Sequence, residues 1–248
     1  MSRLYAPTGV QLIYCADNTL FEFDTSTSYT FTLWVKHSIL TGNQNYVRKD
    51  PGGFSSRNIY AFRLSGTALN FLAGNVSGPG PLAQVSGTHG FAVGTWYFAA
   101  AVRDVAADTL AIYTATSTGG LALIASGNDN STVTHGSNAS SLDFGFYQPS
   151  APTEIFRGTL GDITMWNVAK TSAELDDIRQ GAIISGAGLI GYWPMCGDQS
   201  PEPDLSGNGN NATVSGPTKG ATSAPYSICS DAIAGGGGGG TGCRYTIM

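Results

Sequence analysis

The sequence predicts an all-β protein built as a sandwich of short antiparallel strands. Apolar and polar residues alternate with a period of two along much of the chain, and turn-forming residues separate these stretches. Only 12% of the 248 residues are charged, whereas 34 are Gly and 11 Phe, 11 Tyr and 4 Trp are present. Such a composition suits strands joined by turns, and the length fits one large sandwich.

The composition also excludes several classes of protein. With 12 Lys plus Arg against 17 Asp plus Glu, a net charge of −5 and a pI near 5.0, the chain lacks the basic footprint of nucleic-acid binding. The longest apolar run, Trp96 to Val102, is far shorter than the ~18 residues of a spanning helix. Residues 1–15 show no pattern of a secretory leader. We expect synthesis in a cytosol, or a mature secreted chain that carries a new Met1.

The clearest strand covers residues 29–36. Tyr29, Phe31, Leu33 and Val35 share one face of this strand, which predicts a half-buried strand with its other face toward solvent. Turn signals such as Ser65-Gly66 and Gly119-Gly120 separate further candidates. These further strands are expected at residues 59–64, 68–73, 95–103, 109–115, 121–126, 142–147 and 158–166.

One short helix is expected after the last of these strands. Thr171 and Glu174 form a capping box, in which each side chain bonds the other residue's backbone amide. Leu175 and Ile178 give the helix an apolar edge, and Gly181 can end it in the left-handed conformation. We expect this helix to cover one edge or end of the sandwich.

The C-terminal part of the chain differs in character from the rest. We expect one domain over residues 1–225 and a glycine-rich tail over 226–248, in which residues 235–240 are six consecutive glycines. A tether that precedes an apolar, β-prone segment can pair with the parent sheet or with a neighbouring subunit. A frayed terminus is the alternative. The residues expected to act in assembly are Gly235, Gly240, Cys243, Tyr245 and Ile247.

Four cysteines lie far apart, so the sequence allows three full pairings and chooses none of them. Buried reduced thiols and one disulfide near the C-terminus both remain open. The three histidines keep no ligand-like spacing with the cysteines, which argues against a zinc site.

No catalytic constellation is evident, and we expect no catalytic residue. A glucanase on a β-sandwich needs carboxylates that alternate along one strand. Glu22-Phe23-Asp24 begins this pattern, but Ser26 interrupts it. A Ser/His/Asp nucleophile motif and a phosphate-binding loop are also missing.

Binding candidates are few. Trp34 and Trp166 could stack on a sugar, whereas Trp96 and Trp193 lie inside strand-like runs that favour the core. Asn128 and Asp129 form a polar turn that could contribute to a ligand site.

One cation site is conceivable, since Asx oxygens are ligands that calcium prefers. The residues are Asp198, Asp204 and Asn208, with Asn210 and Asn211 nearby. The alternative is that these residues only shape turns. No cofactor is otherwise expected.

Together, several motifs resemble the laminin-G-like, concanavalin A-like jelly rolls, a superfamily that includes pentraxins and many lectin-type domains. The order and spacing of the motifs cover most of residues 1 to about 220. The four stretches are residues 29–36 (YTFTLWVK), 94–102 (GTWYFAAAV) with its partner 110–113, 156–167 (FRGTLGDITMWN) with the capped helix, and 188–195 (GLIGYWPM) through 204–212 (DLSGNGNNA).

This resemblance implies a concanavalin A-like jelly-roll sandwich of two antiparallel sheets with one short capping helix, and it favours binding over catalysis. Fold alone does not fix function. The first hypothesis is a non-enzymatic virion protein, a phage capsid decoration or fibre subunit. It would be made in the host cytoplasm, sit on the virion surface and bind neighbouring subunits as a homo-oligomer that also displays a glycan-binding face. The alternative is an extracellular carbohydrate-binding, lectin-like adhesion module. A glucanase-type hydrolase is a third hypothesis. We expect neither nucleic-acid binding nor membrane insertion.

Overall fold

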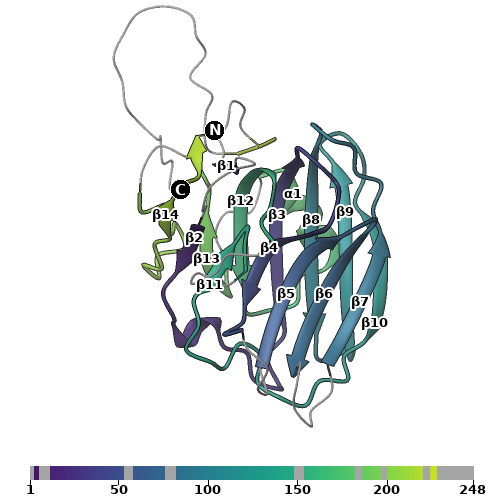
Figure 1. Ribbon diagram of the computed structural model, residues 1–248. Coiled ribbons are helices and arrows are strands. Elements are labelled where there is room, and N and C mark those ends of the chain that lie inside the picture. Colours follow the sequence, from purple (N-terminus) through teal and green to yellow (C-terminus); the bar gives the residue numbers. More distant parts are fainter. Residues whose placement is uncertain are drawn as a thin grey trace, which may run out of the picture.

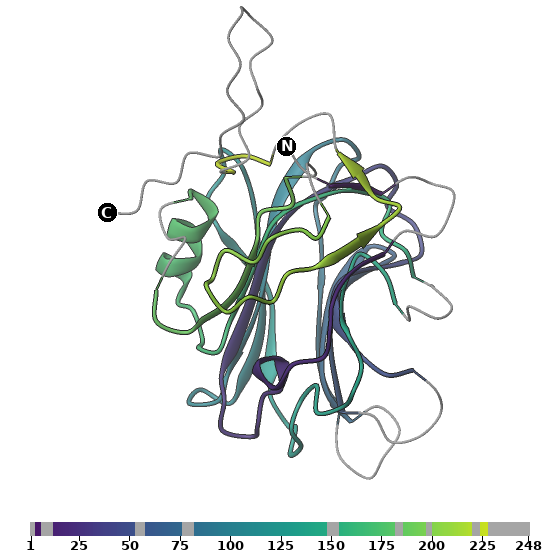
Figure 2. The same ribbon diagram turned by 90° about the vertical axis from the view of Figure 1, so that its left-hand side faces the viewer.

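The computed structural model describes residues 3–5, 12–52, 58–75, 82–147, 154–181, 186–196, 200–219 and 224–227. These residues form two antiparallel sheets stacked face to face (Figures 1 and 2). The all-β sandwich expected from the sequence is therefore confirmed. No helix in this described part of the chain is long and apolar enough to cross a membrane.

The first sheet, sheet A, has the strand order β10-β9-β8-β3-β12-β1-β15, and β13 pairs with β12 beside this path. All of the strand pairings in its described part are antiparallel. Its strands are β1 (Arg3–Tyr5), β3 (Tyr29–His37), β8 (Trp96–Asp104), β9 (Thr109–Thr116), β10 (Ala122–Asn128), β12 (Gly158–Trp166), β13 (Leu189–Trp193) and β15 (Thr218–Lys219).

The second sheet, sheet B, has the strand order β14-β2-β11-β4-β5-β6-β7. A short 3₁₀ helix, η1 (Thr19–Phe21), and one α-helix, α1 (Ser172–Arg179), complete the secondary structure of the described residues. The strands of sheet B are β2 (Leu12–Cys15), β4 (Asn43–Lys49), β5 (Asn58–Ser65), β6 (Ala68–Asn75), β7 (Leu82–Thr88), β11 (Leu142–Phe144) and β14 (Thr213–Ser215).

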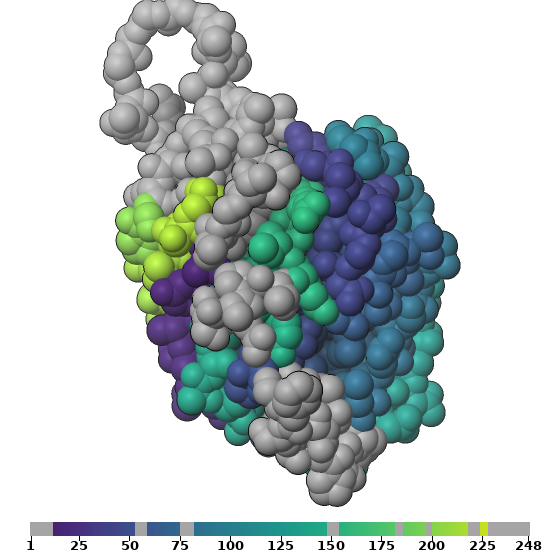
Figure 3. Space-filling model, in the orientation of Figure 1, coloured from purple at the N-terminus to yellow at the C-terminus, as the bar shows by residue number. Residues whose placement is uncertain are grey.

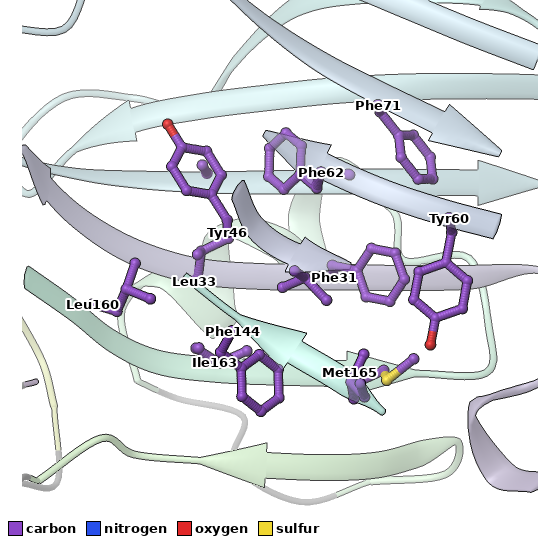
Figure 4. Close-up of a cluster of buried hydrophobic side chains, with 14 of the residues drawn as sticks. Phe31, Leu33, Tyr46, Tyr60, Phe62, Phe71, Phe144, Leu160, Ile163 and Met165 are labelled. Atoms are coloured by element: carbon purple, nitrogen blue, oxygen red, sulfur yellow. The ribbon is translucent and has the colours of Figure 1, made fainter. Parts of the chain in front are cut away.

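The core between the sheets is a cluster of aromatic rings. Tyr29 and Phe31 of β3 in sheet A point inward, as their alternation predicts. Figure 4 shows Phe31 among aromatic side chains of β5 and β6. The ring centroids of Phe31 and Tyr60 are 5.1 Å apart, and those of Tyr29 and Phe71 are 5.9 Å apart in an edge-on arrangement. Tilted and edge-on geometries are those that aromatic pairs prefer.

The outer face of β3 is also buried, which corrects the half-buried strand expected from the alternation. Helix α1 lies against sheet A (Figure 2), and its Leu175 and Ile178 pack on a second apolar cluster that includes Trp34, Phe98 and Trp166. The expected capping box is present: Thr171 Oγ1 accepts from the amide of Glu174, and the Glu174 carboxylate accepts from the amide of Thr171 at 2.8 Å. Gly181 follows the helix with φ +73°, as expected for its end.

The cysteines differ in state. Cys15 is a free, buried thiol that donates to the carbonyl of Asn210 at 3.3 Å, and burial raises its pKa well above the ordinary value. Cys196 is disulfide-bonded. Both alternatives left open by the sequence, a reduced thiol and a disulfide, therefore occur in this chain.

Parts of the sequence-based expectations lie outside the described residues. These are Asp198 and residues 228–248 of the glycine-rich tail, including Gly235, Gly240, Cys243, Tyr245 and Ile247. The domain boundary at residues 225/226 and the assembly role of the tail accordingly stay predictions.

We expect the substitution Phe31→Ala to lower the free energy of unfolding by about 3–5 kcal/mol, because it leaves a cavity among the aromatic rings between the sheets. Urea-induced unfolding followed by tryptophan fluorescence measures this change. Val93→Ala is the control, since Val93 is 56% exposed and its loss is expected to change stability by less than about 0.5 kcal/mol. Equal effects of the two substitutions would contradict the placement of Phe31 in the core.

Candidate functional site

The tryptophans singled out in the sequence lie mostly in the interior. Trp34 and Trp166 are 2% and 0% exposed beneath helix α1, so neither presents a ring face to a sugar. Trp193 is in the main core, as expected. Trp96, which was expected in the core, is only partly buried, and the amine of Lys36 lies 5.1 Å from its ring centroid. The candidate site described below includes none of the four.

Asp129 has a structural partner. Its carboxylate accepts from Nε of Arg103 at 2.5 Å, while the same guanidinium donates to the carbonyls of Asp24, Thr25 and Thr27. Arg103 is almost fully buried, so this ion pair fixes the turn before β3 against the end of β10. Asn128 is exposed at the end of β10 and lies outside the candidate site.

Asp204 and Asn208 hold the turn that follows β13. The Asp204 carboxylate accepts from the amides of Tyr192, Ser206 and Asn210 at 2.9–3.0 Å, and the Asn208 amide donates to the carbonyl of Ile190 at 3.2 Å. These bonds fit the role of turn formers. The described residues contain no group of three or more His, Cys, Asp or Glu side chains able to hold a metal. Calcium binding stays an untested prediction.

The outer face of sheet B carries a cluster of buried polar and charged groups. Tyr60, Phe62 and Leu64 of β5 point into the core, which directs Arg63 outward. In β4 the register shifts between Asn45 and Val47, and Tyr46 and Val47 both enter the core. This β-bulge places Asn45 and Arg48, three positions apart, on the same outer face as Arg63.

We call this surface the polar face and define it by Asn45, Arg48, Arg63, Asn70 and Asp143. Neighbouring strands bring these residues together: Asp143 of β11 faces Arg48, Asn45 faces Arg63, and Arg63 faces Asn70 of β6. The strands that carry the polar face, β11 and β4 to β6, lie side by side in Figure 1. All but Arg63 are buried residues.

Glu154 joins these side chains. Its carboxylate accepts from Nδ2 of Asn45 at 2.7 Å, from Nη1 of Arg48 at 3.2 Å and from Nη1 of Arg63, which is 3.2 Å from both oxygens. Nδ2 of Asn43 adds a further bond at 3.2 Å. The backbone of Glu154 has φ +49°, a conformation that non-glycine residues seldom adopt. A strained residue that gathers two arginines and two asparagines is typical of a functional position.

The charges of this cluster are largely compensated. Burial by itself raises the pKa of Glu154, but the hydrogen bond from Asn45 and the charges of Arg63 and Arg48 outweigh it and lower that pKa below its ordinary value. Arg48 also pairs with Asp50 at 2.6 Å, and its guanidinium lies 3.7 Å from the ring centroid of Tyr147. Glu154 is therefore ionised at neutral pH and holds the guanidinium groups in place.

A depression opens beside the polar face, where β4 begins. It has a volume of about 350 Å³ and is lined by Ile39, Thr41, Gly42, Asn43, Gln44, Glu154, Ile155 and Arg157. In Figure 3, residues 39–44 and the green residues 154–157 lie next to each other on this side of the molecule. Asn43 and Arg157 are exposed and Glu154 is partly exposed, so solvent reaches an amide, a guanidinium group and a carboxylate here.

The polar face also holds hydrogen-bonding groups that are not satisfied. Among the described residues, Oδ1 of Asn45, Nε of Arg63 and Oδ2 of Asp143 are buried and have no hydrogen-bond partner. Leaving such groups unpaired costs about 1–3 kcal/mol each. In native proteins such groups are usually paired, with ordered water among the partners.

A comparison with models of protein families identifies the superfamily of the chain. A model described as "Concanavalin A-like lectin/glucanases superfamily" matches residues 13–176. The chain belongs to this superfamily. The resemblance stated from the four sequence stretches is therefore confirmed. A comparison with curated protein sequences gives no match.

Several solved structures share this fold at low sequence identity to the chain. A protein of Bacteroides ovatus ATCC 8483, named a "putative carbohydrate binding protein", has a TM-score of 0.66 at 15% identity; the match covers 91% of this chain and 61% of that protein's length. The CBM40 module of the Ruminococcus gnavus IT-sialidase has a TM-score of 0.51 at 10% identity, with 62% and 83% covered. The enzymatically active domain of bacteriophage CBA120 tailspike protein 2 has a TM-score of 0.50 at 12% identity, with 77% and 34% covered.

Sequence reasoning did not find the polar face of this superfamily member. Its residues come from four strands, so no local motif brings them together. One signal was available: in a chain with only 12 Lys plus Arg, Arg63 stands inside the β-prone stretch 59–64. Buried arginines need partners, and this requirement could have marked them for attention.

Asp143 makes stability depend on pH. Burial raises its pKa to about 7, against opposing effects of Ser141 and Arg48. From pH 4 to pH 8 the folded state holds this proton more tightly than the unfolded state does, so stability falls as pH rises. We expect the free energy of unfolding of the parent protein to fall by about 2–4 kcal/mol relative to that of Asp143→Asn across this range.

Urea unfolding of both proteins at pH 4, 6 and 8 checks this expectation. Asp177→Asn is the control, because it makes the same chemical change at an exposed position on α1, outside the polar face. A constant difference between the parent and Asp143→Asn would refute the pKa assigned to Asp143.

Proposed function

We propose that the chain is a non-enzymatic saccharide-binding module whose ligand lies in the depression beside the polar face. The observation that carries this proposal is the fixed cluster around Glu154, which borders an open depression and leaves buried hydrogen-bonding groups unpaired. Binding sites of this kind place a few polar groups at fixed positions in a hollow surface.

The chemistry of the depression suits a sugar. Asn43 offers an amide, Glu154 offers carboxylate oxygens and Arg157 offers guanidinium donors, so both donors and acceptors are available to hydroxyl groups. Because the arginines and Asn45 already hold Glu154, its side chain loses little freedom on binding, which favours affinity. Ile39 and Ile155 add apolar surface for the faces of a sugar ring.

The names of two fold neighbours support a saccharide as the ligand. The Bacteroides ovatus protein is named for carbohydrate binding, and the Ruminococcus gnavus module is a CBM40. Their identities to this chain are 15% and 10%, so the names support the choice of ligand class and not of a particular sugar.

The carboxylates near the polar face favour binding over hydrolysis. Glycoside hydrolysis requires two carboxyl groups that both reach the scissile bond. The side chain of Asp50 is 0% exposed and pairs with Arg48, and Asp143 is buried as well. Among the described acidic residues of this cluster only Glu154 reaches solvent, and its lowered pKa makes it a poor proton donor.

We expect Asn43→Ala to weaken saccharide binding at least tenfold, because the substitution removes an exposed amide that lines the depression and bonds Glu154. A glycan array identifies ligands of the parent protein, and isothermal titration calorimetry then compares the variants on one of them. Asn128→Ala is the matched control, since Asn128 is an equally exposed asparagine at the far end of sheet A.

Two results would overturn the proposed site. If the array gives no ligand, saccharide binding is wrong. If Asn128→Ala weakens binding as much as Asn43→Ala does, the ligand lies elsewhere.

We propose separately that the chain binds other subunits of an assembly, as a virion decoration or fibre protein on a particle surface. The feature that favours this role is the run of six glycines before the apolar residues 243–248. Such a tether suits exchange of a terminal strand between neighbours. An extracellular adhesion module is the alternative setting for the same saccharide site.

Deletion of residues 235–248 is expected to lower the oligomeric state, because the deleted segment supplies the strand that pairs with a neighbour. Size-exclusion chromatography with light scattering measures the mass of both chains at matched concentration. A monomeric parent protein, or equal masses for the two chains, would contradict the assembly role.

A further inference from the structure

We propose that Gln44 is the positioning residue of the saccharide site, because its side-chain amide holds the two walls of the depression together. This inference rests on the proposed function and adds the residue that fixes the shape of its site. It is argued from the three hydrogen bonds of Gln44, from its burial and from the backbone bonds on either side of it.

The two walls of the depression come from distant parts of the chain. One wall is residues 39–43, between the end of β3 and the start of β4, and the other is residues 154–157, which lead into β12. Gln44 also lines the depression, yet it is only 2% exposed, so its side chain lies beneath the walls and not in the solvent. A buried side chain at this position can hold both walls at once.

Backbone hydrogen bonds join the two segments at both ends. The amide of Ser38 donates to the carbonyl of Arg157 at 2.8 Å. The amide of Asn45 donates to the carbonyl of Glu154 at 3.0 Å. Residues 39–44 therefore span, with six residues, a gap that two residues span in the opposite segment, and this excess of chain must arch away. An arch of this kind takes backbone groups away from their partners in a regular ladder.

Gln44 provides partners for three backbone groups at this arch. Its Nε2 donates to the carbonyls of Ile39 and Thr41 at 3.1 Å and 3.2 Å. Its Oε1 accepts from the amide of Arg157 at 2.9 Å. The first two bonds fix the arch, and the third ties the arch to the opposite wall. An amide side chain suits this task because it offers donors and an acceptor together.

The fixed arch matters for a ligand because Asn43 and Glu154 line opposite walls of the depression. Glu154 is held by two arginines and Asn45, whereas Asn43 stands on the arch and bonds Glu154 at 3.2 Å. Without the bonds of Gln44, a ligand would have to order residues 39–43 on binding, and this cost would lower its affinity. Gln44 thus acts through the groups that it holds in place.

Gln44→Glu tests this role through pH. The introduced carboxyl group is buried, so we expect its pKa to be raised. At pH 9 the ionised group accepts hydrogen bonds but donates none, and the carbonyls of Ile39 and Thr41 lose their partner. At pH 5 the protonated group can again donate to one of the two carbonyls. Binding by this variant should therefore recover as the pH falls.

The titratable groups beside Gln44 keep their charge over this range. Burial lowers the pKa of His37 to about 4, against a smaller opposing effect of Gln44, so His37 stays neutral. Burial raises the pKa of Glu154, but the hydrogen bond from Asn45 and the charges of the two arginines outweigh it and lower that pKa, so Glu154 stays ionised. Arg157 keeps its charge because guanidinium groups do not lose their proton in proteins.

We expect Gln44→Glu to bind the glycan identified by the array at least about tenfold more weakly than the parent protein at pH 9, because two buried carbonyls lose their donor. At pH 5 we expect the ratio to shrink to about threefold, since one donor returns. Isothermal titration calorimetry of both proteins at each pH gives this ratio, which removes the titration of Asp143 that both share. Gln84→Glu is the matched control, because it makes the same change at an exposed position of β7.

Gln44→Met separates the hydrogen bonds from the charge. Methionine is unbranched and neutral, and it cannot form the three bonds of the amide. We expect it to weaken binding at least about tenfold at both pH values. The thermal melting temperature shows whether each variant folds. Should Gln44→Glu fail to fold at pH 9, the comparison of Gln44→Met with the parent protein at pH 7 replaces it.

The outcomes distinguish this inference from the proposed function. If a glycan binds and the Gln44 variants bind it as tightly as the parent protein does, the inference fails and the proposed function stands. If Gln44→Glu is weaker by the same factor at pH 5 and pH 9, missing donors are not the cause and the inference fails as well. If the array gives no ligand, both fail.

Discussion

The contact between the inner faces of the two sheets is the interaction on which the rest of the structure depends. Tyr29 and Phe31 of β3 pack against Tyr60 and Phe71 of sheet B, with ring centroids 5.1–6.1 Å apart. Because side chains alternate along a strand, fixing these rings inward fixes Arg63 outward. The register of the core therefore determines which residues form the polar face, and the site needs no motif of its own.

Much of the fold could be predicted, because its signals are local. The alternation in residues 29–36 directs Phe31 inward, and the Thr171–Glu174 capping box starts α1 where expected. Strand β4 could not be found in this way. Its sequence, NQNYVRK, is largely polar and lacks alternation. Its buried Arg48 is stabilised by Glu154, more than a hundred positions away, and single-sequence patterns contain no information about such a partner.

The candidate site was harder to predict than the fold because exposure is a tertiary property. Trp34 and Trp96 both stand in β-strands, yet α1 covers the first and leaves the second partly open. The sequence predicts the helix but not the face that it covers. Asp129 likewise lies in a stretch with the composition of a polar turn, and only its ion pair with the buried Arg103 shows that the turn is structural.

The β-bulge in β4 has a consequence for how this surface could change between related proteins. The extra residue lets Asn45 and Arg48 share a face although they are an odd number of positions apart. Loss of Tyr46 or Val47 would remove the bulge and restore regular alternation, with Asn45 and Arg48 two positions apart and still on the outer face. The core would lose one side chain, since both residues point into it. The arrangement of the polar face could thus persist through a single-codon deletion that changes the packing between the sheets.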